Sequence, residues 1–147
     1  MKVSTKGRYG VRFMMDLAVN GQGGRVNLRQ IGKRQNISWN YLWQIVNRLK
    51  SAGLIRATAG SKGGYSLAMA PQHITLGKIL MILEGDIGLV PAAREPASCT
   101  GSNACAAREI WAEVNDKIAA VLESITLEDM ARKQLEMAQS STTEYSI

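Results

Sequence analysis

Apolar residues recur at steps of three and four in several stretches of the chain, the spacing that places side chains on one face of an α-helix. The clearest stretch lies within residues 36–65 and contains Ile37, Leu42, Ile45, Val46 and Leu49. Ser38 is suited to cap the start of this helix, and Gly53 to follow its end. Similar patterns predict helices at residues 4–19, 28–35, 75–84 and 109–125, with a last short helix that Thr126 begins and that ends near residue 134.

A basic, glycine-rich hairpin is predicted directly after the helix of residues 36–53. Residues 54–58 and 64–68 have the composition of short strands, and Gly60 to Gly64 form a flexible cationic loop between them. Three helices followed by a hairpin is the order of a winged helix-turn-helix domain. The predicted fold class is therefore mainly α with a small β-hairpin: a winged helix-turn-helix domain plus a long C-terminal dimerisation helix.

The domain organisation follows from these patterns. Residues 1–84 form the predicted DNA-binding domain, and 85–107, which contain both cysteines and no usable periodicity, form a loop. Structureless loops of about 20 residues are uncommon unless they serve a function. Residues 108–138 contain the long helix and the short terminal helix, and the polar tail 139–147 is expected to be disordered.

The charge is divided unevenly along the chain. The net charge is +6, but residues 1–68 contain 12 basic side chains and one acid, Asp16, for a net of +11; the remainder contains 6 basic and 11 acidic side chains. A solvated basic surface would explain the positive charge but not the near absence of acids. Release of counterions from phosphates drives the binding of such segments to nucleic acids.

The chain has no apolar run of the roughly 18 residues that a membrane helix needs, and its N-terminus lacks the core of a signal peptide. We therefore expect a cytoplasmic protein with no membrane partner.

The polar face of the helix at 36–53 and the hairpin supply the candidate DNA contacts. A helix fits the major groove, and a loop without bulky side chains allows its backbone to approach phosphate. Lys6 and Arg8 lie in the first helical turn, where cations are disfavoured, and a phosphate would offset that cost. The residues expected to face bases are Ser38, Asn40, Tyr41, Trp43 and Gln44; Lys6, Arg8 and Arg48 add affinity, and Gly60, Ser61 and Lys62 form the wing.

The long helix near the C-terminus carries an apolar stripe that a small domain has little core to cover. Paired recognition helices read palindromic half-sites about 34–36 Å apart, which favours a homodimer. The alternative is that this helix folds back on its own chain. The expected dimer contacts are Ile110, Trp111, Val114, Ile118, Val121 and Leu122.

The chain resembles the Rrf family of bacterial winged-helix regulators, the group of IscR, NsrR and CymR. The resemblance rests on MKVSTKGRYGVRFMMDLA, ISWNYLWQIVNRLKSAGLI, GSKGGYSLA, CAAREIW and ITLEDM, which together cover the chain to about residue 134. It implies a cytoplasmic homodimer that binds double-stranded palindromic promoter DNA, commonly as a repressor. Many members hold an iron-sulfur cluster that sets DNA affinity.

The resemblance is incomplete at the cluster. Of the three loop cysteines of cluster-bearing relatives, only Cys99 and Cys105 are present, and Ala93, or with some alignment slack Arg94, stands where the first is expected. A two-iron two-sulfur cluster needs about four ligands. Three interpretations stay open: a cluster completed by other ligands, a thiol switch, or a loop with neither. CymR-type relatives work without a cluster and respond to a protein effector.

The family's fourth-ligand positions are also altered. A histidine three residues after the last cysteine is Arg108 here, and an acid of the first helix is Arg8. The single histidine, His73, is expected to be a surface residue.

Two further departures affect DNA reading. Relatives often have a glutamate where this chain has Trp43 and a wing arginine where it has Ala59. A carboxylate accepts a hydrogen bond from cytosine and a wing arginine enters narrow minor grooves, which indole and alanine do not do. We expect an altered or relaxed sequence preference. Packing of Trp43 within the domain is the alternative.

Two other function classes fit the sequence less well. An adaptor that binds an enzyme would have little use for the basic half, and its binding should survive high salt, whereas a regulator's should not. No paired-carboxylate, His–Ser or His–Cys motif indicates an enzyme.

Overall fold

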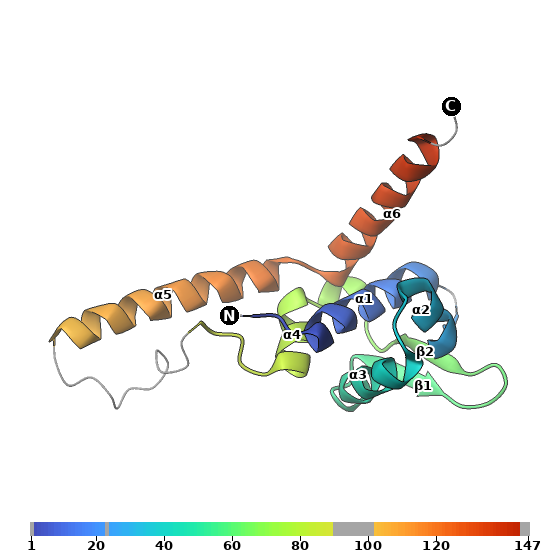
Figure 1. Cartoon of the computed structure of the whole chain (residues 1–147), viewed down its shortest axis with the longest axis horizontal. Coiled ribbons are helices and arrows are strands. Elements are labelled where there is room, and N and C mark those ends of the chain that lie inside the picture. Colours follow the sequence, from blue (N-terminus) through green and yellow to red (C-terminus); the bar gives the residue numbers. More distant parts are fainter. Residues whose placement is uncertain (1, 23, 90–101, 145–147) are drawn as a thin grey trace.

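The computed structural model describes residues 2–22, 24–89 and 102–144. Figure 1 shows a winged-helix body from which two helices extend. The elements are α1 Thr5–Asn20, α2 Leu28–Gln35, α3 Trp39–Ser51, β1 Ile55–Thr58, β2 Gly64–Leu67, the 3₁₀ turn η1 Pro71–His73, α4 Leu76–Glu84, α5 Ser102–Ser124 and α6 Leu127–Glu144. The predicted fold class is confirmed: the described residues form a mainly α structure with a two-stranded hairpin.

The core of the winged helix lies where α1, α3 and α4 meet. Phe13 of α1, Leu42 of α3 and Ile79 of α4 are all fully buried within one apolar cluster. Gly10 of α1 leaves room for the side chain of Leu83 from α4, because a Cβ at Gly10 would collide with it. The apolar stripes predicted from the sequence therefore share one interior.

The starts of the first four helices follow from local capping. The hydroxyls of Ser4, Ser38 and Thr75 accept hydrogen bonds from backbone N–H groups of the first turns of α1, α3 and α4. The side chain of Asn27 does the same for α2. A cap satisfies a donor that the helix itself leaves without a partner, so each of these starts is specified by a residue beside it. All four predicted starts are confirmed.

The hairpin is antiparallel, with Ile55 opposite Leu67 and Thr58 opposite Gly64. Backbone hydrogen bonds of 2.9 and 2.8 Å join Val26 and Tyr65, so the segment before α2 pairs with β2. Gly60, at the turn, has a φ of +106°, a conformation that glycine adopts without strain. The wing is thereby held against the helix-turn-helix.

The helices α5 and α6 connect to the body at a short bridge. Backbone bonds join Leu76 N to the Ile125 oxygen at 2.8 Å and Leu127 N to the Ile74 oxygen at 2.7 Å. Thr126 and Asp129 exchange side-chain-to-backbone hydrogen bonds of 3.1 Å, a capping box that begins α6. The first turns of α6 pack on α1, while its C-terminal end extends away from the body (Figure 1).

Two predicted boundaries are wrong. The helix expected at 109–125 begins at Ser102, so the predicted loop 85–107 ends earlier and Cys105 lies on a helix. Alanines at 104, 106 and 107 favour a helix without adding large apolar side chains to mark a period. The short terminal helix continues to Glu144, where a disordered tail was expected. Hydroxyls of Ser140, Ser141 and Thr142 donate to carbonyls four residues earlier.

Within the part of the chain that the structure describes, none of the helices has the length and apolar character that a bilayer crossing requires.

Candidate nucleic-acid interface

The outer face of α3 presents the side chains expected to read bases. Asn40, Trp43 and Gln44 are exposed, so the alternative in which Trp43 packs within the domain is not observed. The Ser38 hydroxyl is exposed but also caps α3, since it accepts a hydrogen bond from Tyr41 N at 3.3 Å. The Tyr41 ring is half-buried against Tyr9 of α1, edge to face, with centroids 5.7 Å apart.

The wing carries its cation at the tip. Ser61 and Lys62 are exposed, beside Gly60. The Arg25 guanidinium donates a hydrogen bond of 3.3 Å to the Lys62 carbonyl, which brings a second cation to the wing. Arg25 was not among the residues expected from the sequence, because 37 positions separate it from Lys62 and no local pattern links the two.

The start of α1 has an anion of its own. The Glu84 carboxylate accepts hydrogen bonds from Ser4 N at 2.8 Å and from Ser4 Oγ at 2.5 Å. A carboxylate at this position complements the helix dipole. Lys6 is half-buried and Arg8 exposed in the same turn. Their position therefore does not by itself require a phosphate, which corrects the expectation drawn from the sequence.

Arg48 lies at the opposite end of α3. Its guanidinium donates to the Leu83 carbonyl of α4 at 3.5 Å, and its side chain remains exposed. It is therefore placed at the junction of α3 and α4.

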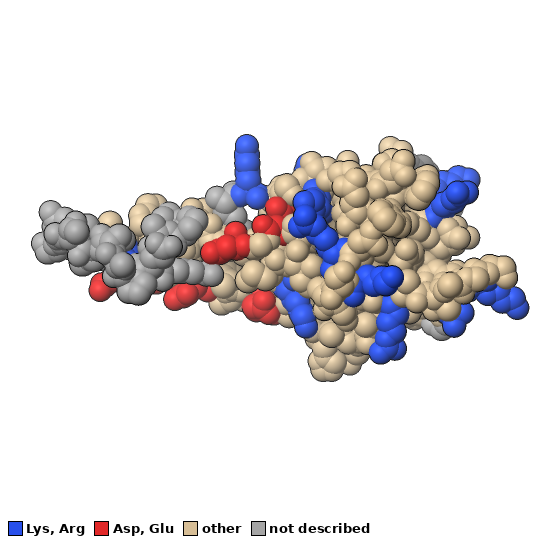
Figure 2. Space-filling model, turned by 90° about the horizontal axis from the view of Figure 1, so that it is seen from below, with Lys and Arg blue, Asp and Glu red and all other residues tan. Residues whose placement is uncertain are grey.

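The distribution of charge over the surface matches its distribution along the sequence. In Figure 2 lysine and arginine side chains gather over the winged helix, and acidic side chains lie towards the α5 part of the molecule. The single acid of residues 1–68, Asp16, is buried and thus adds no negative charge to that face. Over residues 1–68 a polyanion therefore meets cations and no exposed carboxylate, whereas the Glu84 carboxylate lies at the start of α1.

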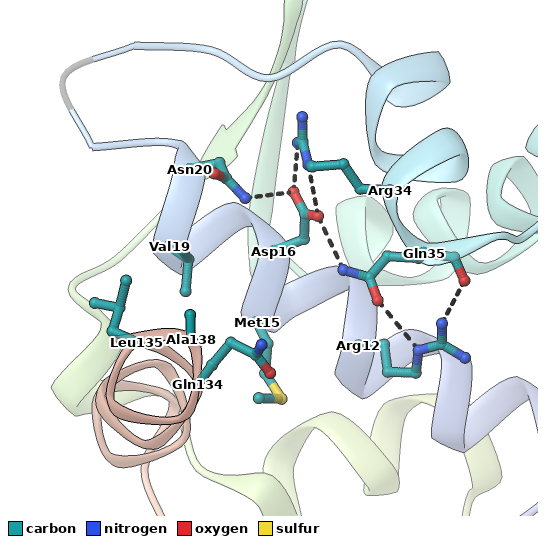
Figure 3. Close-up of a pocket in the computed structure, with 10 residues that line it drawn as sticks. All are labelled: Arg12, Met15, Asp16, Val19, Asn20, Arg34, Gln35, Gln134, Leu135 and Ala138. Carbon is teal, nitrogen blue, oxygen red and sulfur yellow. Dashed lines mark hydrogen bonds and ion pairs between the residues drawn. The ribbon is translucent and has the colours of Figure 1, made fainter. Parts of the chain in front are cut away.

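The buried Asp16 joins α1 to α2 through a partly buried network of hydrogen bonds (Figure 3). Its carboxylate accepts hydrogen bonds from Arg34 at 2.6 and 3.0 Å, from Gln35 at 3.0 Å and from Asn20 at 3.3 Å. Burial opposes ionisation, but these hydrogen bonds and the Arg34 charge outweigh it, so the pKa of Asp16 lies below its ordinary value. Arg12 also donates to the Gln35 side chain and backbone. The network sets α2 against α1.

A cavity of about 440 Å³ lies beside this network, between the α1–α2 layer and α6. Met15 and Val19 of α1 face Leu135 and Ala138 of α6 across it (Figure 3). The charged groups of its wall are already bonded to one another or to Gln35. The cavity therefore lies beside the contact of α6 with α1, and in its wall Arg34 pairs with Asp16 while Arg12 bonds to the neutral Gln35.

The structure describes the two predicted metal ligands only in part. Cys99 lies outside the described residues, and Cys105 is placed on α5 by its backbone alone. No group of three or more His, Cys, Asp and Glu side chains that could hold a metal occurs in the described ranges. With two cysteines in the chain, the donor set falls short of the four or so ligands that a two-iron two-sulfur cluster needs. A cluster would therefore need further ligands besides these two cysteines.

The six residues expected at the dimer contact lie along α5. Ile110, Trp111 and Val121 are exposed, whereas Val114, Ile118 and Leu122 are half-buried. The helix packs in part on α4, and the Asn115 side chain accepts a hydrogen bond of 2.8 Å from Leu89 N. Packing on the chain's own surface thus covers part of α5, and the described residues leave Ile110, Trp111 and Val121 exposed.

Comparison with known proteins agrees with this geometry. The profile of the Rrf2 family, described as an iron-dependent transcriptional regulator, matches residues 3–133. The HTH-type transcriptional regulator CymR of Bacillus subtilis (strain 168) is 41% identical over 89% of this chain and 90% of its own length. The HTH-type transcriptional regulator IscR of Aliivibrio salmonicida is 32% identical over 88% of this chain and 77% of its own length.

Solved structures show the same relationship. The structure of B. subtilis CymR, titled the global cysteine regulator, has a TM-score of 0.78 and 40% identity, and covers 90% of this chain and 98% of that one. T. potens IscR has a TM-score of 0.74 and 40% identity over 95% of this chain and 91% of that one. The chain therefore belongs to the Rrf2 family of HTH-type transcriptional regulators.

Proposed function

We propose that this regulator is a homodimer that binds palindromic double-stranded promoter DNA and acts as a repressor. The observation that carries the proposal is the exposed polar face of α3 beside a cationic wing. The single acid of residues 1–68, Asp16, is buried. A helix of this kind enters the major groove while flanking cations bind phosphates. Base reading is assigned to Ser38, Asn40, Tyr41, Trp43 and Gln44, and phosphate contact to Lys6, Arg8, Arg48 and Lys62.

The exposed side of α5 supports the dimer. Ile110, Trp111 and Val121 form an apolar surface that the described part of the same chain leaves uncovered. A twofold pair of such helices would bury these residues and place two copies of α3 on successive turns of one DNA face, about 34–36 Å apart.

Salt dependence of DNA binding tests the regulator against the adaptor. The probe is a duplex selected from a random-sequence pool by the full-length protein. With six to ten phosphate contacts, affinity should fall about 10³–10⁵-fold between 50 and 200 mM salt. Failure to enrich any duplex, or affinity that is independent of salt, would contradict DNA binding by this surface. A repressor should also lower transcription from the selected site in a purified system.

The sensor of this regulator is proposed to be the cysteine loop, with Cys99 and Cys105 as the responding residues. Two mechanisms would use these cysteines. In one, a two-iron two-sulfur cluster takes further ligands from the second protomer; in the other, the thiols are oxidised reversibly. The 41% identity with CymR favours the alternative in which a protein effector controls a cluster-free regulator.

Anaerobic purification with iron and sulfide analysis discriminates these mechanisms. A shared cluster predicts iron and sulfide in equal amounts and a visible absorption that replacement of both cysteines by serine abolishes. A colourless protein whose DNA affinity changes with oxidant, and loses that change in the serine variants, supports the thiols. DNA binding that changes neither with oxidant nor with replacement of the cysteines supports control by a protein effector.

A further inference from the structure

Two indole side chains stand exposed on α3, in the most basic part of the molecule. Trp39 is 48% exposed and Trp43 is 52% exposed. Residues four apart lie about 40° apart around a helix and are neighbours on its surface. The two rings therefore form one apolar strip along the first turns of α3. Such a strip amid cations is expected to be covered by an apolar group of a charged partner.

Arg29 of α2 defines the side of α3 on which this strip lies. Its guanidinium is positioned over the Trp39 ring, 5.7 Å from the centroid. A cation over an indole face is attracted by the negative charge of the ring. The contact places the tryptophan strip on the flank of α3 nearest α2, and it places a positive charge at the edge of the strip.

The amides on the same helix lie on the adjoining part of the exposed face. Asn40 and Gln44 are exposed, one position after each tryptophan. An amide can pair with adenine through its donor and acceptor atoms, whereas an indole face has only an apolar surface to offer. The exposed side of α3 thus has an apolar flank and a polar centre.

The major groove of DNA matches this arrangement. The thymine C5-methyl group is the apolar feature of its base edges, and phosphates line its rim. We propose that Trp39 and Trp43 read thymine by covering C5-methyl groups, while Arg29 binds the phosphate beside them. This proposal rests on the proposed function, the binding of duplex DNA by α3.

The observed contacts favour duplex over single-stranded DNA as the occupant of the strip. Stacking of unpaired bases requires an open ring face. Arg29 covers one face of Trp39, so a base cannot insert there. Methyl groups of a duplex can contact the remaining surface without displacing Arg29.

Replacement of thymine by deoxyuridine in a selected site tests the proposal, because it removes the C5-methyl group and leaves all hydrogen-bonding groups in place. The full-length protein selects duplexes from a random pool, and each thymine of the enriched half-site is then replaced in turn. At a few positions this replacement should weaken binding about fourfold, because the contribution from burying one methyl-sized group is lost.

Substitution of the tryptophans tests whether these residues cover the methyl groups. W39Q and W43Q should bind the thymine and deoxyuridine duplexes equally at the position that each residue covers. Arg29→Gln should weaken binding to both duplexes and lower the salt slope by about 1. Met81→Gln, which alters a side chain 51% exposed on α4, is the matched control and should keep the full methyl effect.

Each outcome is decisive. Equal binding of thymine and deoxyuridine duplexes by the unmodified protein, or an undiminished methyl effect in both tryptophan variants, overturns the proposal. DNA binding that leaves both indoles open to a fluorescence quencher also overturns it and assigns the strip to a protein partner. If no duplex is enriched at all, the proposed function fails first, and this inference with it.

Discussion

The winged helix and α5 are built from the same kind of amphipathic helix, but they bury their apolar faces differently. In α3, Leu42, Ile45 and Leu49 are at most 1% exposed. In α5, Ile110, Trp111 and Val121 are 59%, 45% and 58% exposed. Periodicity thus indicates that a face must be covered, but it does not indicate which surface covers it.

The two regions also differ in how they use charge. In the winged helix the single acid of residues 1–68, Asp16, pairs with Arg34, and the other cations of these residues are exposed except for the half-buried Lys6. In α5 and α6 the charges pair along one helix, as between Lys117 and Glu113 at 2.9 Å and Arg132 and Asp129 at 3.2 Å. Exposed pairs of this kind contribute little to stability. The winged helix is therefore the part of the chain suited to a polyanion, and α5 the part suited to an apolar partner.

The largest expected effect breaks the α5 side of this comparison. Replacing Trp111 and Val121 together by serine should weaken self-association by about 3–6 kcal/mol, on the order of a hundredfold or more. Each protomer loses two side chains that are about half exposed in one chain, and burial of the exposed half of each contributes about 0.75–1.5 kcal/mol. Sedimentation equilibrium measures it. Asp116→Asn, on the same helix, serves as the control. If the double variant stays dimeric at the concentrations at which the unmodified protein is dimeric, α5 does not join the two copies.

The next effect concerns the buried face of α3. Leu42→Ala should lower the free energy of unfolding by about 2–5 kcal/mol, since it leaves a cavity in a close-packed core. Urea unfolding at a fixed protein concentration measures the change. The side chain of Val121 is exposed in one chain. Val121→Ala, measured in a variant that is already monomeric, should therefore lower the free energy of unfolding much less. Equal losses at both positions would remove the contrast between the two helices.

A moderate effect is expected from the Asp16 network. Asp16→Asn keeps the size of the side chain but removes the charge that Arg34 and Gln35 bind, which should cost about 1–3 kcal/mol of unfolding free energy at pH 7. Glu113→Gln, on the exposed side of α5, is the matched control and should change little.

The same network predicts a pH dependence. The pKa of Asp16 is lower in the folded state, so its stabilisation is present above the unfolded-state pKa, about 4, and is lost as pH falls through the folded-state value. The Asp16→Asn variant should lack this component of the acid sensitivity. Parallel stability curves for the two proteins between pH 7 and pH 2 would contradict the assignment.

The smallest expected effect sharpens the description of the wing. Lys62→Ala should weaken binding similarly for all duplex sequences and reduce the slope of log affinity against log salt by about 0.9, the value for one phosphate contact. Fluorescence anisotropy at several salt concentrations measures the slope. A loss confined to one sequence would instead indicate that Lys62 contacts a base.

Much of the winged helix was predictable because its signals are local. Caps at Ser4, Asn27, Ser38 and Thr75 act on backbone groups two or three positions away. The boundaries that failed lack such signals. Residues 102–107 are helical because alanine favours a helix, and they carry no large apolar stripe. At 140–142 the side-chain hydroxyls donate hydrogen bonds to carbonyls of their own helix, which a polar composition does not reveal.

The candidate site was predictable in its residue types and only partly in its geometry. Exposure of Asn40, Trp43 and Gln44 follows from their place opposite the apolar stripe. The roles of Arg25 beside Lys62 and Arg29 above Trp39 do not. These partners are separated in sequence and meet through the pairing of the segment before α2 with β2 and the packing of α2 on α3. The metal assignment stays a prediction, since Cys99 lies outside the described residues.

The sequence by itself determined the order of the elements, the faces that must be buried and the division of charge, because periodicity, caps and composition act over a few residues. Only the tertiary structure decided which long-range partners satisfy which groups. It placed Glu84 at the start of α1, 80 residues from Ser4, and buried Asp16 against Arg34. It also left one side of α5 uncovered. These outcomes depend on how whole helices pack, which no local pattern encodes.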